Sequence, residues 1–400
     1  MIVDLPSTTT AAVSKKLIQL REDVGSMALG RVLTLVIVVE EDAADEAIEV
    51  ANSASRQHPC RIVCLVSANK RGGARLDAQI RVGGDAGASE VVVLRLFGAL
   101  TQHGPSVVTP LLLPDSPVVV WWPREAPADL RHDAIGRMAQ RRITDAAHSS
   151  NPLRALKKRG ETYRDGDTDL AWTRISLWRG LLAAALDQPP YDQVVEATVT
   201  GAPESPSADL LAAWLAYSLK CPVRLARAER GSGIISVRLG RKGGGTLDLA
   251  RPEGSTATLL QTDQPDRRIA LAHRSDAECL SEELRRLDPD EVYEDALLLG
   301  IPKLNKGRSL TQAEAVRKGE ALAPAEAEKA ARRIKRESRS RSSAAMVEAD
   351  LPPEDASVSQ VKKAAARQLA TKAPDKAAKD APGTVREDAK RAAKRTRARR

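Results

Sequence analysis

Aromatic residues, cysteines and long apolar runs are all scarce in this 400-residue sequence. Aromatics make up only 2% of it, so a core has to be built mainly from the aliphatic part of the 42% hydrophobic residues. The longest apolar stretches, such as 32–39, are far shorter than the roughly 20 residues that a membrane span needs. The first residues, with Asp4 and Pro6, lack the charged and then apolar pattern of a secretory signal. We therefore predict a cytoplasmic protein without a membrane span.

The four cysteines are too few for a disulfide framework. Cys60 and Cys64 are four residues apart on an expected strand, which places both on one face of a sheet. This is not the Cys-x-x-Cys spacing of redox sites, so two buried core thiols are the preferred interpretation. Free thiols are expected at all four positions.

Charge is distributed unevenly along the chain. The sequence has 62 Lys and Arg against 53 Asp and Glu, a net charge of +9. Residues 305–400 hold 25 of the basic and 13 of the acidic residues, a net charge of +12, which leaves −3 for residues 1–304. The high pI therefore describes a basic C-terminal segment and not the surface of the preceding part.

Strand and helix signals alternate between residues 1 and 155. A helical apolar face is formed by Val13, Leu17, Leu20 and Val24, and another helix is expected over 42–57. Strands are expected at 31–39, 60–67, 76–82, 90–96 and 116–122. This alternation predicts an α/β layer domain over residues 1–155 with partly parallel strands.

A second domain is expected at residues 165–304. A helix at about 169–187 opens it, and strand signals then follow one another closely, with one helix at 208–219 among them and two helices after 275. Consecutive strands predict an α+β domain with an antiparallel sheet.

Residues 305–400 contain no aromatic residue and are rich in Ala, Lys and Arg, which predicts a disordered tail, with transient helix around 311–336.

No complete catalytic, cofactor or metal motif is present. The glycine-rich stretches at 83–87, 231–233 and 243–245 match neither the dinucleotide fingerprint nor the P-loop. The five histidines are far apart, without metal-ligand spacing. Asp165, Asp167 and Asp169 begin like a calcium loop, but Leu170 and Ser176 stand where Gly and Glu are needed, so Asp169 is interpreted as a helix cap. We predict no cofactor, no metal and no catalytic residue.

Two clusters of Trp and Arg are the candidate partner interface. The first is Trp121, Trp122 and Arg124, with Arg142 close in sequence. Neighbouring residues on a strand face opposite ways, so one Trp can enter the core while the other points outward to a partner. The alternative is that helices cover both. Trp and Arg are the residues most enriched at interface hot spots.

The second cluster is Trp172, Arg174, Trp178 and Arg179 on an expected helix. Arg174 and Trp178 are one turn apart and could stack cation over ring, while Trp172 and Arg179 share another face. A helix that packs between two domains is an equally good interpretation.

The sequence resembles the OpcA family of glucose-6-phosphate dehydrogenase assembly proteins, in its actinobacterial form, over about residues 1–304. The stretches that carry the resemblance are Leu94–Leu100 (LRLFGAL), Pro110–Val118 (PLLLPDSPV), Trp121–Pro123 (WWP), Arg142–Asp145 (RITD), Trp172–Ile175 (WTRI), Trp178–Arg179 and Ala185–Asp187.

The resemblance implies an α/β N-terminal domain, a second C-terminal domain and no enzymatic activity. It also implies a role as an assembly factor or allosteric activator of glucose-6-phosphate dehydrogenase, the enzyme that feeds the oxidative pentose phosphate pathway and supplies NADPH. Two alternatives stay open. The basic end of the chain, 394–400, could bind nucleic acid weakly and without sequence preference, or the α/β domain could be a sugar-phosphate-binding enzyme.

Overall fold

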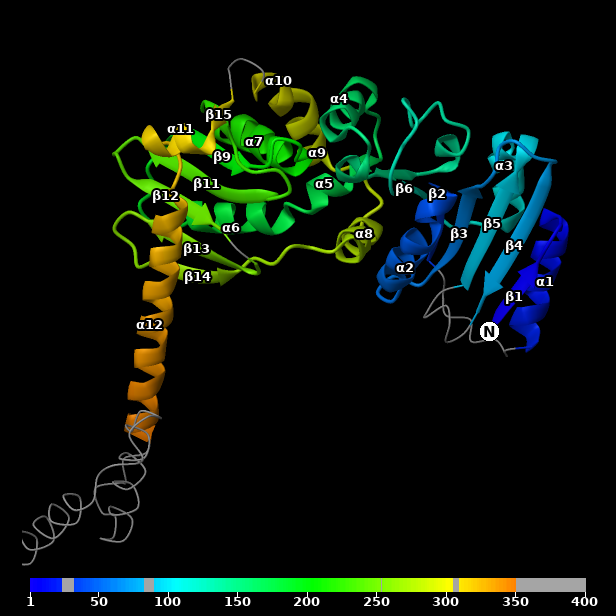
Figure 1. The fold of residues 1–400 in the computed structure, drawn as a ribbon, viewed down its shortest axis with the longest axis horizontal. Helices are drawn as coiled ribbons and strands as arrows, with labels where there is room; N and C mark the ends of the chain where they lie inside the picture. Colours follow the sequence, from blue (N-terminus) through cyan, green and yellow to red (C-terminus); the bar gives the residue numbers. More distant parts are fainter. Residues whose placement is uncertain (24–31, 83–89, 253, 305–308, 350–400) are drawn as a thin grey trace, which may run out of the picture. The chain divides into compact units, whose positions relative to one another are not determined.

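The computed structural model describes residues 1–23, 32–82, 90–252, 254–304 and 309–349. Residues Met1–Ala331 form one compact unit, and the chain from Arg332 on belongs to a second. The first unit contains two mixed sheets, each with helices packed against it (Figure 1). This confirms the predicted fold class, an α/β domain followed by a second domain that mixes helices and strands.

The described part of the first sheet has the strand order β1-β4-β5-β3-β2-β6-β7-β8. Its strands are β1 (Ile2–Leu5), β2 (Leu33–Glu40), β3 (Cys60–Ser67), β4 (Arg75–Arg81), β5 (Glu90–Phe97), β6 (Val118–Trp122), β7 (Arg141–Thr144) and β8 (Asp167–Asp169). The six strands from β5 to β8 are parallel, whereas β1 and β4 form an antiparallel edge. Numbered by sequence, the parallel strands have the order 3-2-1-4-5-6, which is the order of dinucleotide-binding sheets.

Helices cover both faces of this sheet. One face packs against α1 (Thr10–Asp23) and α3 (Gly104–Val108), and Val13, Leu17 and Leu20 are buried there as predicted. The other face packs against α2 (Ala44–Ser55), with both predicted core thiols, Cys60 and Cys64, in the same cluster. A buried strand that is apolar on both faces, such as β2, is the expected consequence of this double cover.

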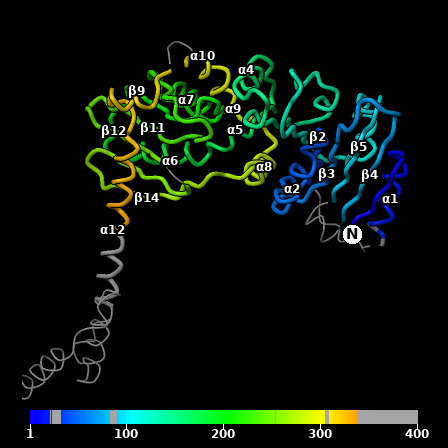
Figure 2. Tube along the Cα trace, in the orientation of Figure 1, coloured from blue at the N-terminus to red at the C-terminus, as the bar shows by residue number. Residues whose placement is uncertain are grey.

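The face that carries α2 is completed by a helix from much later in the sequence. Helix α8 (Asp276–Arg285) contributes Cys279, Leu280 and Leu284 to the core cluster of α2 and the first sheet. The Cα trace shows α8 beside α2 (Figure 2), and α8 is tied there by Ser281 Oγ, which donates to Gln57 Oε1 at 3.0 Å. A segment assigned to the second domain by the sequence therefore packs on the first sheet.

The second sheet has the described order β14-β13-β12-β11-β9-β10-β15. Its strands are β9 (Val194–Gly201), β10 (Val223–Arg227), β11 (Ile234–Arg241), β12 (Thr246–Ala250), β13 (Thr256–Gln261), β14 (Arg267–Ala270) and β15 (Leu310–Thr311). The predicted antiparallel pairing is confirmed for β9 and β11 to β14, but β10 and β15 pair in parallel. Helix α7 (Pro206–Leu219) makes the crossover from β9 to β10, and it packs against the π-helical turn η7 (Asp295–Gly300).

Two short helices connect the two sheets, after a third that makes the crossover from β7 to β8 within the first sheet. Helix α4 (Pro152–Thr162) follows β7, with Asn151 as its N-cap. Helix α5 (Leu170–Thr173) begins at β8, with the side chain of Asp169 accepting from the backbone N–H of Ala171, as predicted for a cap. Helix α6 (Ser176–Leu186) leads into the second sheet. The strand β8 lies beyond the boundary predicted near residues 155–165, so the first sheet extends into the range given to the second domain.

The predicted disorder from residue 305 onward is wrong for the part that follows residue 309. Strand β15 adds to the edge of the second sheet, and α11 (Gln312–Arg317) begins with a capping box of Thr311 and Glu314. Ala315, Ala321 and Leu322 are buried against the sheet, as is Ala327 near the start of α12 (Pro324–Ala349). Alanines together with Leu310 and Leu322 fill this surface, so the lack of aromatic residues, on which the prediction depended, does not prevent packing. Residues 350–400 lie outside the described part.

Candidate functional site

The two tryptophans at the end of β6 are both buried. Trp121 and Trp122 are each 2% exposed, and they belong to the core clusters on opposite faces of the first sheet. Their opposite directions confirm the strand geometry, but helices cover both faces. Both rings are therefore buried, which agrees with the alternative that helices cover both residues.

Arg142 is also internal. Its side chain is 1% exposed, and it donates to the carbonyl of Ala139 at 2.8 Å and to the carboxylate of Asp167 and the carbonyl of Asp165. Burial raises the pKa of Asp167, and the ion pair with Arg142 acts in the opposite direction. Arg142 thus joins β7 to the turn before β8, and it is not available to a partner.

Trp172 and Trp178 are both buried in the core cluster of the second sheet. The Trp172 indole N–H donates to Asp290 Oδ2 at 2.8 Å, and its ring centroid lies 5.7 Å from that of Tyr293. The guanidinium of Arg179 lies 3.7 Å from the Trp172 ring, which agrees with the shared face predicted for these two residues. These contacts support the interpretation of a packing helix.

The predicted stacking of Arg174 on Trp178 is wrong. The cation over the Trp178 ring is Arg251, at 5.2 Å from the ring centroid. Arg174 instead forms a bidentate ion pair with Asp145, at 2.7 and 2.6 Å, and a further bond of 2.5 Å to Asp276. Because a guanidinium bonded to two carboxylates gains more than it would from a ring face, the ion pairs determine its position.

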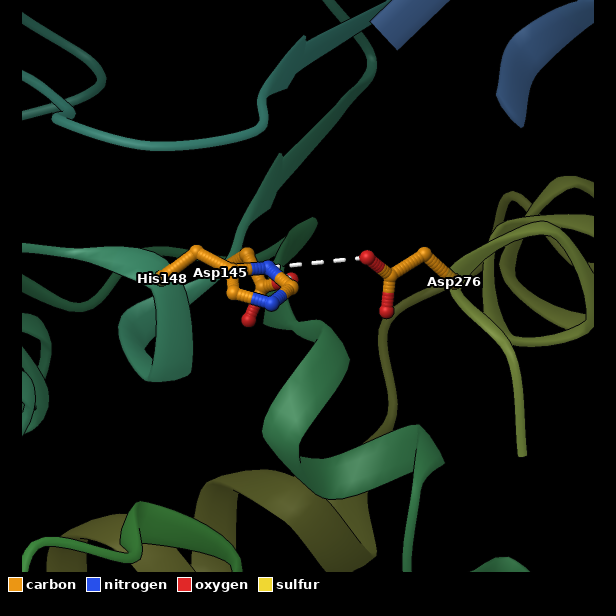
Figure 3. Close-up of side chains that lie close together, drawn as sticks. All are labelled: Asp145, His148 and Asp276. Carbon is orange, nitrogen blue, oxygen red and sulfur yellow. Dashed lines mark hydrogen bonds and ion pairs between the residues drawn. The ribbon is translucent and has the colours of Figure 1, made fainter. Parts of the chain in front are cut away.

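A network of Asp145, His148, Arg174 and Asp276 joins three segments of the chain. Figure 3 shows three of its members, Asp145, His148 and Asp276. Asp145 follows β7, Arg174 lies between α5 and α6, and Asp276 begins α8. His148 Nδ1 lies 2.9 Å from Asp145 and 3.5 Å from Asp276. Asp145 is part of the RITD stretch seen in the sequence, but nothing there indicated its ion pair with Arg174, which is 29 residues away, or the bond of Arg174 to Asp276, which is 102 residues from Arg174.

The network perturbs the titration of its members. Burial alone would raise the pKa of Asp145, but hydrogen bonds from Arg174 and His148 outweigh it and hold that pKa below its ordinary value. The hydrogen bond to Asp145 raises the pKa of His148. The imidazole and Asp145 therefore favour their charged forms together.

Asp145, His148 and Asp276 are also a group that could hold a metal ion, since their ligand atoms lie within 4.8 Å of one another. The Arg174 guanidinium donates to both carboxylates, so its positive charge already occupies the place of a cation. These residues fit an arginine better than a metal.

Arg124 is the most exposed of the eight candidate residues. Its side chain is 50% exposed and forms an ion pair of 3.0 Å with Glu46, which is 69% exposed. It lies just after β6, next to the point where the strand order of the first sheet reverses between β2 and β6. A dinucleotide would place its pyrophosphate near the end of β2 in such a sheet. Glu40, Glu41 and Asp42 stand there instead of a glycine-rich turn, which disfavours that cofactor.

Two cavities flank the segment 145–149. One, of about 670 Å³, lies at the carboxyl ends of β7 and β8 and is lined by Thr144, Arg159 and Asp169, among others. The other, of about 430 Å³, lies between this segment and the start of α7. Both volumes are within the usual range of small-molecule sites.

Two family models match the chain, in sequence order. The model described as the glucose-6-phosphate dehydrogenase subunit N-terminal domain matches residues 51–161, and the model of the C-terminal domain of that subunit matches residues 165–297. Both models are of the OpcA family, and together they take in more than half of the chain. The chain belongs to this family.

Other similarities are partial. An OxPP cycle protein, OpcA, of Synechococcus elongatus is 31% identical over 151 residues, which cover 35% of this chain and 34% of that protein. The match thus spans about a third of the length of this curated OpcA relative. A Gfo/Idh/MocA family oxidoreductase from Vibrio cholerae is 11% identical with a TM-score of 0.33, over 68% of this chain and 95% of that one. A glucose-6-phosphate dehydrogenase with its substrate is 6% identical with a TM-score of 0.33, over 74% and 99%. TM-scores this low support no inference about fold or function.

In this OpcA chain, the stretches that carry the resemblance lie mainly inside the fold. Four of them supply β5, the strand β6 with its two tryptophans, the end of β7 and the helix α5. No helix of the described residues is both long and apolar enough to cross a bilayer.

Proposed function

We propose that this OpcA-family chain is a non-catalytic subunit that binds glucose-6-phosphate dehydrogenase and promotes its assembly or activity. In that role it supports the oxidative pentose phosphate pathway and its supply of NADPH. The observation that carries the proposal is the match of both domains of the subunit, in order, over residues 51–161 and 165–297. The actinobacterial type and the cytoplasmic location predicted from the sequence are part of the same proposal.

The chemistry of the described residues supports a binding role. His132, His148 and His273 hydrogen-bond to Asp129, Asp145 and Arg251, and none of these bonds activates a hydroxyl or a thiol. Burial raises the pKa of the Cys64 and Cys279 thiols to about 12, so neither is a nucleophile near neutral pH. These observations favour a binding subunit over the alternative of a sugar-phosphate enzyme.

Activation by binding needs only a difference in affinity. A subunit raises activity if it binds the active or assembled form of the enzyme better than the inactive form. A tenfold shift between the two forms requires about 1.4 kcal/mol of differential binding free energy. A few contacts of one side chain can supply this amount.

The interface itself stays a prediction. The exposure of the candidate side chains indicates which of them can contact a partner directly. The four candidate tryptophans and Arg142 are buried, so they act on a partner only by holding the surface in shape. Arg124 can contact a partner directly, and Arg174 and Arg179 are partly exposed. We therefore place the proposed contact at the carboxyl end of β6.

A charge reversal tests this contact. Arg124→Glu is expected to weaken the pulldown of purified glucose-6-phosphate dehydrogenase by the full-length chain. Lys70→Glu is the matched control, because Lys70 forms an ion pair of the same length with Glu40, and both of these side chains are 58% exposed. Equal binding by the two variants would remove Arg124 from the interface, although it would leave the subunit assignment intact.

The nucleic-acid alternative concerns residues 394–400, outside the described part. Truncation after Ala331 separates it from the proposed function. The truncated chain is expected to activate the dehydrogenase as the full chain does, because it keeps both sheets. Loss of activation with the tail would contradict the proposal that the folded body is the effector.

A further inference from the structure

The smaller of the two cavities is lined by basic groups. Its walls come from the segment after β7, the start of α7, the turn 231–234 and the ends of β12 and β14. The basic side chains among its lining residues are Arg174, Arg251, Arg274, His148 and His273. The carboxylate in this lining is Glu204, whose Oε1 accepts from the backbone N–H of Gly231 at 2.6 Å, while its Oε2 is buried without a hydrogen bond among the described residues.

Arg251 is the unusual member of this group. It is 6% exposed, and it donates to the carbonyls of Leu271 and Ile234 at 3.0 and 3.4 Å. Among the described residues it has no carboxylate partner, and burial lowers its pKa to about 10. A buried cation without a counter-charge is costly, because it has lost its hydration without gaining an ion pair.

Three other buried arginines of the same chain are paired with carboxylates. Arg61 bonds to Glu90 at 3.0 Å, and Arg141 bonds to Glu283 at 2.6 Å. Arg142 pairs with Asp167. Within the cavity, Arg174 and Arg274 are also neutralised, by Asp145 and by Glu282. Arg159 and Arg241 are also buried without an ion pair among the described residues, so the lack of a counter-charge distinguishes Arg251 only together with its place in this cavity beside the start of α7.

The backbone around the cavity also favours an anion. Helix α7 begins there, with Ser205 as its N-cap and Pro206 in its first turn. A helix of 14 residues has a partial positive charge at this end. The Trp178 ring centroid lies 5.2 Å from the Arg251 guanidinium. Of the five N–H groups of this side chain, two donate to carbonyls and one faces His273 Nδ1, which leaves the others for an acceptor.

We propose that this cavity binds a small phosphorylated metabolite, with its phosphate against Arg251 and the first turn of α7. A phosphate monoester presents several oxygens to a guanidinium fork and supplies the negative charge that Arg251 lacks. The volume of about 430 Å³ leaves room for a sugar-sized group beside the phosphate. This inference goes beyond the proposed subunit function and does not depend on it.

Binding of such a ligand would hold two parts of the chain together. His148 comes from the segment after β7 of the first sheet, whereas Arg251 and the start of α7 belong to the second sheet. A ligand that contacts both would stabilise their arrangement. A metabolite would in this way set the fraction of molecules that are in a conformation able to bind a partner.

The test measures ligand-dependent thermal stability of the full-length protein in a phosphate-free buffer. The probes are glucose 6-phosphate, inorganic phosphate and, as the uncharged control, glucose. We expect glucose 6-phosphate to raise Tm in a saturable way and more than inorganic phosphate does, and glucose to have no effect. Calorimetric titration of the same samples gives Kd.

Two variants assign the response to the cavity. Arg251→Met should abolish the shift without lowering the Tm of the ligand-free protein, because it removes an uncompensated charge. Arg251→Lys keeps the charge but loses the fork, and it should raise Kd about tenfold. The matched control is Arg159→Met, since Arg159 is 7% exposed, has no ion pair among the described residues and lines the larger cavity.

Several results would overturn the proposal. They are no shift with either anion, a shift that persists in Arg251→Met, or a shift lost in Arg159→Met and kept in Arg251→Met. An equal Tm shift with inorganic phosphate and with glucose 6-phosphate would assign the site to the free ion. It would overturn the proposal that the ligand is a phosphorylated metabolite. If Arg251→Met does not fold, an unchanged Kd in Arg251→Lys overturns the proposal by itself.

Discussion

Replacing Arg174 tests how the network of Asp145, His148, Arg174 and Asp276 holds the chain together. Arg174→Met removes three hydrogen bonds, two of them to Asp145, whose side chain is fully buried. Asp145 then keeps His148 as its charged partner, at 2.9 Å. Breaking a buried ion pair from one side costs about 3–5 kcal/mol, because the remaining charge is left without its partner.

The expected loss lies near the lower end of that range. His148 compensates part of the charge of Asp145, and Asp276 is 25% exposed and can be solvated by water. We therefore expect the free energy of unfolding to fall by about 3 kcal/mol, measured by urea unfolding with an unchanged slope. Arg124→Met is the matched control. Its ion pair is half exposed, so the loss should stay below about 1 kcal/mol.

The pH dependence of the same network has a definite sign. The pKa of His148 is raised in the folded state, so its stabilising charge is fully present below its ordinary pKa of about 6.5 and is lost as pH rises through the folded value. The pKa of Asp145 is lowered, so its contribution is present above about 3.9 and is lost as pH falls through the folded value. The stability difference between wild type and His148→Gln should therefore shrink as pH rises above neutrality.

A loss in Arg174→Met no larger than that in Arg124→Met would refute this reasoning. It would mean that packing of the tryptophans, and not the ion pairs, fixes the three segments. A stability difference for His148→Gln that grows with pH would contradict the assigned direction of its pKa.

Three further predictions concern packing and thiols. Truncation after Leu304 should lower the urea midpoint, whereas truncation after Ala331 should not, because Ala315, Leu322 and the strand β15 cover the sheet edge; equal midpoints would contradict this. Gly300→Ala should cost about 1–3 kcal/mol, since its Cβ would lie 2.4 Å from the carbonyl oxygen of Ala213, whereas Gly180→Ala meets nothing within 4 Å and should not destabilise. A thiol-reactive chromophore should label Cys221 in the folded protein and the three buried cysteines only in urea; a second fast thiol would show that a core position opens.

Much of the first sheet could be predicted because its strands are apolar. The runs that became β2, β3 and β5 are buried on both faces, and such runs are visible in any sequence. Strand β7 was missed, since two of its four residues are arginines. They are buried because Asp167 and Glu283 neutralise them, and these partners are 25 and 142 residues away. No local pattern contains that information.

The burial of the candidate tryptophans could not be predicted for a related reason. Large aromatics and arginines are enriched both at interfaces and at the joints between packed elements, so their presence does not distinguish the two. Trp121 and Trp122 alternate in direction as a strand requires, but only the position of α8, from a distant part of the sequence, shows that the Trp121 face is covered. The sequence also could not predict that Arg251 lacks a carboxylate partner, because the residues that surround it in space come from distant parts of the chain.

The central claim is that the folded body of this OpcA chain raises the activity of glucose-6-phosphate dehydrogenase by binding to it. The most direct measurement combines NADPH production and particle mass for the purified dehydrogenase, with and without the full-length chain. We expect higher activity together with a heavier particle, and no NADPH from the chain alone with glucose 6-phosphate. Turnover by the chain alone, or an unchanged activity and mass of the dehydrogenase, would contradict the account.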